Sequence, residues 1–424
     1  MSERPRAVVV VTGSELVRGE RTDRNGPFLA AEALSHGLEP ARITIVGDAP
    51  AELETVLREG LEADACLVSG GLGPTHDDRT VELVARVAGV SLRVEEQLER
   101  EIEAVSRSIA ERLGRPYTDF AAGVTKQATV PDGAEVIGIA GTAPGLVLQG
   151  ERCVYVVLPG PPGELRRLWP SAIASQALGA VLRRATPPGR HVLRFFGASE
   201  SAVAQALAEA GGDGDGVEAT ICARDFEIHI DLVVEPGAEE RGDTLAAALR
   251  APLVQYLFAE DERSIAEIVL GLCRERGYTL ATAESCTGGL VAARLSDVAG
   301  ASDVLAGGVV SYSNDVKTTE LGVPEELIAA HGAVSAEVAE AMAAGVRERL
   351  GVHVGIAVTG VAGPGGGTPE KPVGLVHLHV ETPERGQGTT FSLPGDRAAV
   401  RTRATVSALH LARRVLTRSR HEGT

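Results

Sequence analysis

Short apolar runs alternate with amphipathic segments through the first 170 residues of the chain. The spacing predicts strands at residues 7–11, 43–46 and 65–69 and helices at residues 25–34 and 51–61. Strand and helix therefore alternate as in βαβ units, and near-continuous apolar strands are typical of a parallel sheet covered on both faces. The pattern predicts a doubly wound parallel-sheet α/β domain over residues 1–170, with ligand-binding loops at the carboxyl ends of its strands.

The pattern changes after residue 170 and again after residue 261. The middle segment, residues 171–258, has strand-like runs at 191–196 and 226–234 and helical runs at 200–210 and 243–257. This predicts a small α+β domain, and because it carries no motif associated with chemistry we interpret it as a connecting or docking module. From residue 262 strands and helices alternate again, which predicts a second α/β domain over residues 262–424.

Composition narrows the classes of partner. A formal charge of −17 argues against direct nucleic-acid binding, which depends on clustered Lys and Arg. The five cysteines are scattered and never form a CxxC pair, so neither a disulfide framework nor a zinc site is predicted. The apolar run at residues 7–11 is shorter than the core of a signal peptide, and no run approaches a membrane-spanning length. We expect a cytoplasmic protein with no membrane partner.

The strongest candidate for chemistry is a pair of motifs in the last segment, AESCTGG at residues 283–289 and SYSNDVK at residues 311–317. A strand-like run precedes the first motif and a helical apolar pattern follows it, so residues 285–289 should form a tight strand-to-helix turn. The two glycines let a ligand approach the main chain. Amides at a helix start can hold an anion, either a phosphate or the oxyanion that develops in acyl transfer.

Ser285 and Lys317 fit the roles of nucleophile and base. Only three of the 41 basic residues are lysines, so a position that needs surface charge alone would usually hold arginine here. A desolvated lysine can lose its proton and act as a base toward a serine, whereas a guanidinium stays charged. The alternatives are a helix-capping serine and a solvated lysine, and the spacing alone leaves both open.

Cys286 competes with its neighbour for the role of nucleophile, because a thiol is intrinsically the better attacker. A cysteine amidase normally pairs its thiolate with histidine, and no histidine lies in a motif loop of this segment. We therefore expect Ser285 to attack. Tyr312 is expected either to hydrogen-bond the serine–lysine pair or the substrate, or to pack at the end of a strand.

A glycine-rich loop, residues 70–80, is the main candidate site of the first segment. Its amides can cradle phosphate, and Asp77 and Asp78 bring oxygen ligands for a divalent cation. The alternative is a Gly-Pro turn followed by an aspartate-capped helix. In the last segment, residues 360–368 are too rich in glycine to form only a turn, and Arg397 could bind a carboxylate or phosphate bidentately or simply begin the final helix.

Together these motifs resemble those of the CinA family, the competence/damage-inducible protein A family, nearly from end to end. The first segment carries GGLGPTHDD at residues 70–78, GTAPG at 141–145 and LPGPP at 158–162. The last segment carries the two motifs already described, VTGVAGP at residues 358–364 and GDR at residues 395–397. Residues 13–15 and 138–140 depart from the family pattern, and both departures lie in the first segment.

For the last segment the resemblance implies an amidohydrolase that converts nicotinamide mononucleotide to nicotinate mononucleotide and ammonia without a cofactor. Ser285 would attack the carboxamide carbon, Lys317 would take the proton, and amides near Thr287 and Gly288 would stabilise the oxyanion. The expected substrate contacts are Thr287, Gly288, Gly289, Thr359, Gly360 and Arg397.

For the first segment the resemblance implies a molybdopterin-binding-like domain that splits ADP-ribose at its diphosphate with a divalent metal, Mg²⁺ or similar. The expected metal ligands are Asp48, Asp77 and Asp78, of which Asp48 rests on its position at a strand end. The expected substrate contacts are Gly70, Gly71, Gly73, Thr75 and Gly160.

Two alternatives belong to other classes. The first segment could bind molybdopterin, because the same motifs serve both activities. The whole chain could instead be a competence-related scaffold that works by binding protein partners. We also expect a homodimer, because symmetric dimers are the commonest assembly.

Overall fold

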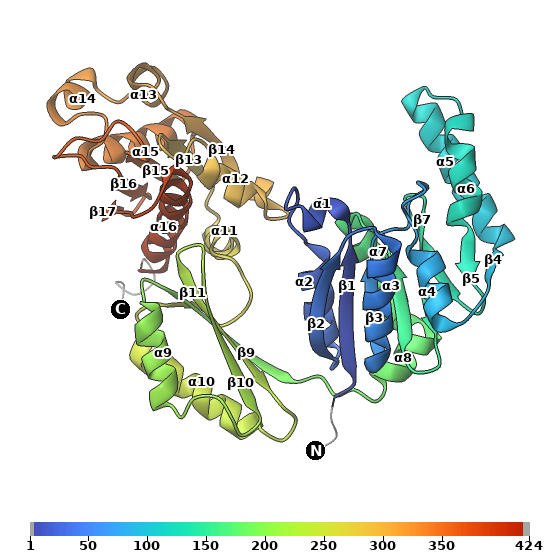
Figure 1. Cartoon of the computed structure of the whole chain (residues 1–424). Coiled ribbons are helices and arrows are strands. Elements are labelled where there is room, and N and C mark those ends of the chain that lie inside the picture. The colour runs from blue at the N-terminus through green and yellow to red at the C-terminus, as the bar shows by residue number, and fades with distance from the viewer. Residues whose placement is uncertain (1–3, 419–424) are drawn as a thin grey trace. The chain divides into compact units, whose positions relative to one another are not determined.

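The computed structural model describes residues 4–418, which separate into two compact units with a border between Gly189 and Arg190. Figure 1 shows the elements of both units. Within the described residues, no helix combines the length and the apolar character that crossing a bilayer requires.

The first unit is built on a six-stranded sheet with the order β2-β1-β3-β8-β7-β6. Its strands are β1 (Arg6–Thr12), β2 (Glu39–Val46), β3 (Ala65–Ser69), β6 (Glu135–Ala140), β7 (Ala143–Gln149) and β8 (Val154–Leu158). The first three strands and β8 run parallel, whereas β7 and β6 are antiparallel to their neighbours. The predicted α/β class is confirmed, but the sheet is mixed and not wholly parallel. The links from β6 to β7 and from β7 to β8 are too short for the crossover that a parallel connection needs.

Helices cover both faces of this sheet because side chains alternate along its strands. On β1, Val8 and Val10 pack in one core and Val9 and Val11 in the other. The first core is closed by α3 (Pro50–Glu59) and α4 (Thr80–Ala88), and the second by α2 (Asn25–Ser35), α7 (Pro162–Ala174) and α8 (Gln176–Leu182). Beside them lie α1 (Ser14–Val17), η1 (Gly60–Glu62), the helices α5 (Glu96–Leu113) and α6 (Thr118–Gln127), and the two-stranded sheet of β4 (Leu92–Val94) and β5 (Thr129–Pro131).

The domain border predicted at residue 170 falls inside α7, and the structure places it near residue 189. Residues 171–189 belong to the first unit because α8 contributes Leu178 and Val181 to the same core as β1 and α2. The helix carries apolar side chains that need a partner surface, and the sheet supplies it.

The second unit begins with a four-stranded sheet in the order β10-β11-β9-β12. Its elements are β9 (Gly189–Phe196), α9 (Glu200–Glu209), β10 (Val217–Arg224), β11 (Glu227–Val234), α10 (Glu239–Leu253) and β12 (Leu257–Ala259). Residues Leu245 and Leu249 of α10 pack on alternate side chains of β11, so one face of the sheet forms a core. These helices and strands agree with the α+β character predicted for this segment.

A five-stranded sheet follows in the order β14-β13-β15-β16-β17. Its strands are β13 (Leu280–Glu284), β14 (Leu305–Val310), β15 (Val354–Gly360), β16 (Leu375–Glu381) and β17 (Gly386–Ser392). The first three pair in parallel and the last two are antiparallel. One face is covered by α11 (Ile265–Arg276), α12 (Leu290–Ser296) and α16 (Arg397–Arg418), and the other by α13 (Asn314–Leu321) and α15 (Ala336–Leu350); η2 (Ala301–Asp303) and α14 (Glu325–His331) complete it.

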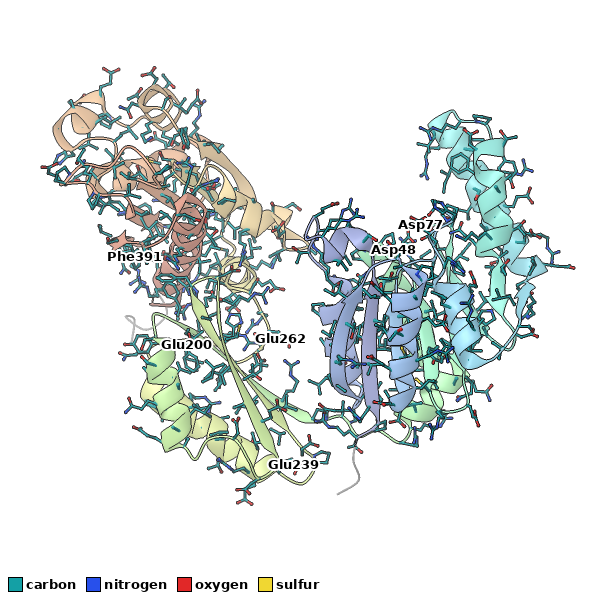
Figure 2. The ribbon with its side chains drawn as sticks, in the orientation of Figure 1. Asp48, Asp77, Glu200, Glu239, Glu262 and Phe391 are labelled. Atoms are coloured by element: carbon teal, nitrogen blue, oxygen red, sulfur yellow. The ribbon has the colours of Figure 1, made fainter. Side chains whose placement is uncertain are left out.

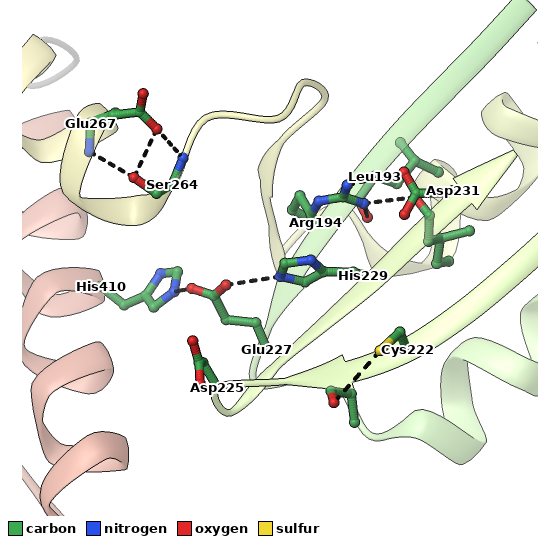
Figure 3. Close-up of polar contacts among 12 residues, drawn as sticks. Leu193, Arg194, Cys222, Asp225, Glu227, His229, Asp231, Ser264, Glu267 and His410 are labelled. Carbon is green, nitrogen blue, oxygen red and sulfur yellow. Dashed lines mark hydrogen bonds and ion pairs between the residues drawn. The ribbon is translucent and has the colours of Figure 1, made fainter. Parts of the chain in front are cut away.

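The two sheets of the second unit are joined through the β10–β11 hairpin (Figure 3). Glu227, buried, accepts a 2.6 Å hydrogen bond from Nε2 of His410 on α16 and contacts Nε2 of His229 at 3.0 Å. The ring of Phe196 stacks on His410 with centroids 3.8 Å apart. Burial lowers the pKa of His410 to about 4, so the imidazole is neutral near pH 7. The middle segment is thus tied to the last helix by a buried polar contact.

The revised border of the first unit can be tested with Leu178→Ala. Leu178 is fully buried, so its truncation should lower the free energy of unfolding of the first unit by about 2–5 kcal/mol. Trp169, the chain's one tryptophan, is buried in the same core and reports that unfolding by fluorescence during urea titration. Leu113→Ala, at an exposed position of α5, should change the transition by no more than about 0.5 kcal/mol. An unshifted Leu178→Ala transition would return the border to residue 170.

Candidate functional sites

The turn after β13 holds the predicted nucleophile. Ser285 directly follows the strand, its N–H donates to the carbonyl of Val358 on β15 at 2.9 Å, and its own carbonyl accepts from the Gly288 N–H at 3.0 Å. Gly288 and Gly289 have φ of 62° and 95°, which L side chains rarely adopt, so the turn needs glycine at both positions. Gly289 is the N-cap of α12 and has no side chain to cap the helix. Ser285 is therefore not a helix-capping serine, an alternative that the sequence alone had left open.

Lys317 lies beside this serine. Its Nζ is 3.2 Å from Oγ of Ser285 and donates to the carbonyl of Ser311 at 2.7 Å. The residue is only 1% exposed, so it is not a solvated surface charge. Burial lowers the pKa of Lys317 because the charged ammonium loses its hydration. The structure brings together a hydroxyl and an amine whose neutral form is favoured by its surroundings.

The adjacent thiol is poorly suited to attack. Cys286 is 5% exposed and belongs to the apolar core beneath the turn. Burial raises the pKa of its thiol to about 11, so the nucleophilic thiolate is scarce near pH 7. Only the serine of the two neighbours lies within hydrogen-bond reach of the Lys317 amine among the contacts of the described residues.

Glu284 is a residue that the motif analysis missed. Its buried carboxylate accepts hydrogen bonds from the amides of Gly289, Val291 and Ala292 and from the Thr282 hydroxyl, at 2.9–3.0 Å. An anion therefore already occupies the positive end of α12. The Gly289 amide is thus engaged within the protein, which does not support its expected bond to a substrate anion, and its role as a substrate contact stays a prediction. The sequence did contain a signal for this residue, because a glutamate directly precedes the predicted nucleophile.

The expected oxyanion donors also change. The Gly288 N–H is already bonded to the carbonyl of Ser285, which does not support its assignment as a donor to an oxyanion. Thr287 is fully buried, its carbonyl accepts from Nη2 of Arg401 at 2.7 Å, and its hydroxyl has no partner among the described residues. Backbone hydrogen bonds from Cys286 and Thr287 lower the pKa of the Cys286 thiol, but burial raises it more. These two amides are the donors nearest to Ser285 along the turn.

Tyr312 does not contact the serine–lysine pair. Its side chain is 58% exposed and its hydroxyl bonds to Nη2 of Arg397, while Nη1 of Arg397 donates to the carbonyl of Gly363 at 2.7 Å. Arg397 begins α16 and links three segments of the unit. The tyrosine therefore bonds to Arg397, and its contact with the substrate stays a prediction.

A pocket of about 690 Å³ lies between α16 and the glycine-rich loop of the second unit, residues 360–368. Its lining is Ala362, Pro364, Val373, Gly395, Asp396, Arg397, Ala398 and Arg401. Arg401 joins this pocket to the Ser285 turn through its bond to Thr287. The wall carries one carboxylate, Asp396, which accepts from the Ala399 N–H, and two guanidinium groups, and its other residues are small or apolar. The two arginines suit an anionic ligand.

Thr359 and Gly360 end β15 near this loop, but their atoms are engaged within the protein. The Thr359 hydroxyl donates to the carbonyl of Ala333 at 2.8 Å and its side chain is fully buried. A Cβ on Gly360 would lie 2.7 Å from the carbonyl oxygen of Leu375. Both residues shape the loop, and their role as substrate contacts stays a prediction.

The first unit has two pockets at the carboxyl ends of its strands. The larger one, about 600 Å³, is lined by Val11, Thr12, Glu15, Leu16, Arg21, Thr22, Asp23, Arg24, Asn25, Ser69, Gly160, Pro161 and Pro162. The smaller one, about 290 Å³, includes Gly71, Gly73, His76, Asp78, Arg79 and Lys126. The structure therefore divides the predicted contacts, with Gly160 on the larger pocket and Gly71 and Gly73 on the smaller one. Gly70 lies between them, where a Cβ would be 2.5 Å from the carbonyl oxygen of Thr12.

Asn25, which the sequence analysis overlooked, holds the larger pocket together. Its buried amide Nδ2 donates to the Ser69 hydroxyl at 2.9 Å and to the Gly160 carbonyl at 2.7 Å. Asp23 accepts from the backbone N–H groups of Asn25 and Gly26. Asn25 and Gly26 begin α2, Asp23 lies two residues before it, and no phosphate-loop pattern marks them in the sequence.

The three predicted metal ligands are not assembled. Figure 2 labels Asp48 and Asp77 at the loop edge of the first sheet. Asp48 accepts from the hydroxyls of Thr12 and Ser14 and from the Ser14 amide, so it fastens the turn after β1. Within the part of the chain that the structure describes, no three His, Cys, Asp or Glu side chains form a group able to hold a metal. The assignment of Asp48 as a ligand is therefore not supported.

Asp77 and Asp78 remain as a pair on the glycine-rich loop. Both accept from the Thr75 hydroxyl, and Asp78 also accepts from the Thr75 N–H at 2.9 Å. The hydrogen bond from Thr75 lowers the pKa of Asp77. Two carboxylates suit Mg²⁺, which usually takes one or two from the protein and the rest from water and substrate phosphate. Thr75 thus binds the carboxylates and is not itself turned to a ligand.

Comparisons with known proteins cover both units. Residues 262–416 match the CinA C-terminal domain, and residues 8–178 match a probable molybdopterin binding domain. A CinA-like protein of Mycolicibacterium gilvum (strain PYR-GCK) is 47% identical over 422 residues, which cover 97% of this chain and 98% of that protein. A CinA-like protein of Mycobacterium tuberculosis (strain ATCC 25177 / H37Ra) is 44% identical over 429 residues, with 98% of each chain covered.

Solved structures match part of the chain. A competence/damage inducible protein CihA from Agrobacterium tumefaciens is 37% identical and covers 38% of this chain and 99% of its own, with a TM-score of 0.35. A CinA protein from Thermoplasma acidophilum is 31% identical and covers 42% and 99%, with a TM-score of 0.36. Because the sequence relatives match along nearly the full length, the chain belongs to the CinA family, with a molybdopterin-binding-like domain followed by a CinA C-terminal domain.

Proposed function

We propose that the second unit hydrolyses the carboxamide of nicotinamide mononucleotide to nicotinate mononucleotide and ammonia. The observation that carries this proposal is the buried Lys317 amine, 3.2 Å from the Ser285 hydroxyl. A serine activated by a lysine of lowered pKa is a general device for acyl transfer from amides. The resemblance to the CinA family supplies the particular amide.

The reaction then proceeds in two halves. Ser285 Oγ attacks the carboxamide carbon while its proton passes to Nζ of Lys317, and the carbonyl oxygen becomes an oxyanion that the amides after Ser285 can stabilise. The tetrahedral intermediate collapses as Lys317 returns a proton to the leaving nitrogen, and ammonia departs. A water molecule, deprotonated by Lys317, hydrolyses the ester and releases nicotinate mononucleotide and the free serine.

The second-unit pocket, between α16 and residues 360–368, supports binding of the phosphate of the substrate. Arg397 and Arg401 lie on its wall, and a guanidinium matches phosphate with two parallel hydrogen bonds. Arg401 also donates to the Thr287 carbonyl, so the same side chain would contact both the substrate phosphate and the catalytic turn. This arrangement would orient the pyridine carboxamide toward Ser285.

For the first unit we propose hydrolysis of ADP-ribose at its diphosphate with a divalent cation. Asp77 and Asp78 would hold the cation, and the cation would neutralise charge on the diphosphate. Lys126 and Gln127 of α6 donate to the carbonyls of Thr75 and Leu72, which holds the loop in place. The match to a molybdopterin binding domain favours a second candidate, a module that binds a pterin phosphate without cleaving it.

Ser285→Ala and Lys317→Arg should each lower kcat for ammonia release from nicotinamide mononucleotide by roughly three orders of magnitude or more, because one removes the nucleophile and the other the titratable base. Cys286→Ala should retain most activity, since its thiol is protonated and buried. Circular dichroism checks that each variant is folded. A Cys286→Ala enzyme as inactive as Ser285→Ala would move the role to the thiol.

The pH dependence should report Lys317. Burial lowers the pKa of this amine, and the base acts only when neutral, so kcat/KM should rise with pH and level off below the usual lysine range of about 10.4. The rise approaches about tenfold per pH unit below the pKa. Initial rates of ammonia release between pH 6 and 10 measure it, with Cys286→Ala as the control that should keep the same limb. A rate that does not change with pH would exclude the lysine base.

Asp78→Ala should abolish metal-dependent ADP-ribose hydrolysis and leave ammonia release unchanged, because Asp78 lies in the first unit and the serine–lysine pair in the second. Asp132→Ala, which removes an exposed carboxylate that contacts Ser91 and Arg93, is the matched control. Chromatography of the AMP and ribose 5-phosphate formed with and without Mg²⁺ gives the result. Full activity of Asp78→Ala would refute the ligand assignment, and an inactive unmutated chain would favour the binding module.

A further inference from the structure

The glycine-rich loop between β15 and β16 forms one wall of the second-unit pocket through Ala362, Pro364 and Val373. Backbone hydrogen bonds close the base of this loop, from Val361 N–H to the Leu375 carbonyl at 2.8 Å and from Gly374 N–H to the Val361 carbonyl at 2.7 Å. The outer part, residues 364–370, is exposed throughout. The base of the loop is therefore ordered by the sheet, and its outer part needs other contacts.

Two cations fasten this loop from opposite sides. Arg397 donates to the Gly363 carbonyl at 2.7 Å on the side of α16. On the other side the Lys371 ammonium donates to the Val334 carbonyl at 2.7 Å and to the carbonyl of His331. Inside the loop, Lys371 N–H donates to the Thr368 hydroxyl and Thr368 N–H donates to the Lys371 carbonyl, both at 3.0 Å. Lys371 thus links the outer loop to the turn between α14 and α15.

That turn, residues 331–335, also contacts the end of β15. The Thr359 hydroxyl donates to the Ala333 carbonyl at 2.8 Å. His331 ends α14, so the Lys371 ammonium lies at the negative end of that helix, where a cation is favoured. Gly332 has φ of 75°, and a Cβ there would be 2.7 Å from Nζ of Lys371, so the turn makes room for the ammonium. Three carbonyls of this turn, those of His331, Ala333 and Val334, therefore receive donors from the loop and its supporting strand.

We propose that Lys371 is a positioning residue that holds the glycine-rich loop over the second-unit pocket and so sets the affinity for the anionic substrate. The proposal rests on the proposed deamidation for its substrate. Lys371 touches neither Ser285 nor Lys317 among the described contacts, so it acts through the loop. Its loss should weaken binding and leave the chemical step nearly unchanged.

Lysine suits this position because its compact ammonium reaches two carbonyls of one turn. The charged groups around it are Glu337 and His331, which lie 3.4 Å apart, and His377 on β16. Lys371 itself makes no ion pair with a carboxylate among the described residues, and its ammonium donates to carbonyl oxygens. A plain surface charge would pair with Glu337 or with water, whereas this one joins two segments of backbone.

The test compares full-length wild type with Lys371→Met, Lys371→Arg and the control Arg250→Met, which removes an exposed cation paired with Glu260 in the other sheet. Ammonia release should show KM for nicotinamide mononucleotide raised about tenfold in Lys371→Met, with kcat within about threefold of wild type. Lys371→Arg keeps the charge and the donors and should return KM to within about threefold. Arg250→Met should match wild type.

Hydrogen–deuterium exchange of the same proteins separates this proposal from the deamidase assignment, because it needs no activity. Exchange in residues 361–374 and 331–335 should quicken in Lys371→Met and not in Arg250→Met. Unchanged exchange, an unchanged KM, or a Lys371→Arg enzyme as impaired as Lys371→Met would overturn the positioning role. If wild type releases no ammonia, the proposed function fails, and equilibrium binding of nicotinamide mononucleotide to wild type and Lys371→Met then decides whether the loop anchor sets affinity.

Discussion

The desolvated amine of Lys317 is the contact on which the second unit depends. An ammonium without water is costly, so the surroundings must hold it where a hydroxyl and a carbonyl are within reach. The register between β13 and β14 achieves this. Glu284 pairs with Val310, and the Ser311 N–H donates to the Glu284 carbonyl at 2.8 Å, so Ser285 and Ser311 leave the sheet side by side. Helix α13 then brings Lys317 back to both.

Charge around the site is divided between two sets of groups. The Glu284 carboxylate occupies the amides at the start of α12, and this removes the usual anion site of a helix start. Cationic side chains from α16 supply positive charge on the other side of the turn, where Arg401 contacts Thr287 and Arg397 contacts Gly363. The helix end thus stabilises the fold of the turn, while the arginines are left to face the pocket.

Apolar periodicity and glycine spacing were sufficient to predict the α/β units and the Ser285 turn, because these follow from local patterns. The pairing of Ser285 with Lys317 was predicted from the scarcity of lysine and the family resemblance, since spacing alone left it open. The same patterns could not predict that β7 runs antiparallel to both β8 and β6, although the short links between these strands carried that information. The border at residue 189 depends on where α8 finds a core, and the partner of Tyr312 depends on Arg397, 85 residues away. The expected role of Asp48 as a metal ligand is likewise not supported, because its hydrogen-bond partners, Thr12 and Ser14, lie elsewhere in the chain. Such contacts arise from tertiary packing and leave no mark at their own positions.

The scarcity of lysine has a practical side. The ammonium groups of all three lysines bond to backbone carbonyls of site loops: Lys126 to Thr75, Lys317 to Ser311, and Lys371 to His331 and Val334. Acylating reagents, aldehyde cross-linkers and amine-coupled sensor surfaces therefore have few side-chain targets on this chain other than its functional loops. Lys126 and Lys371 would be modified before the buried Lys317. A protocol that is harmless for most proteins would here act as a site-directed label, and immobilisation through cysteine or a terminus would keep the loops intact.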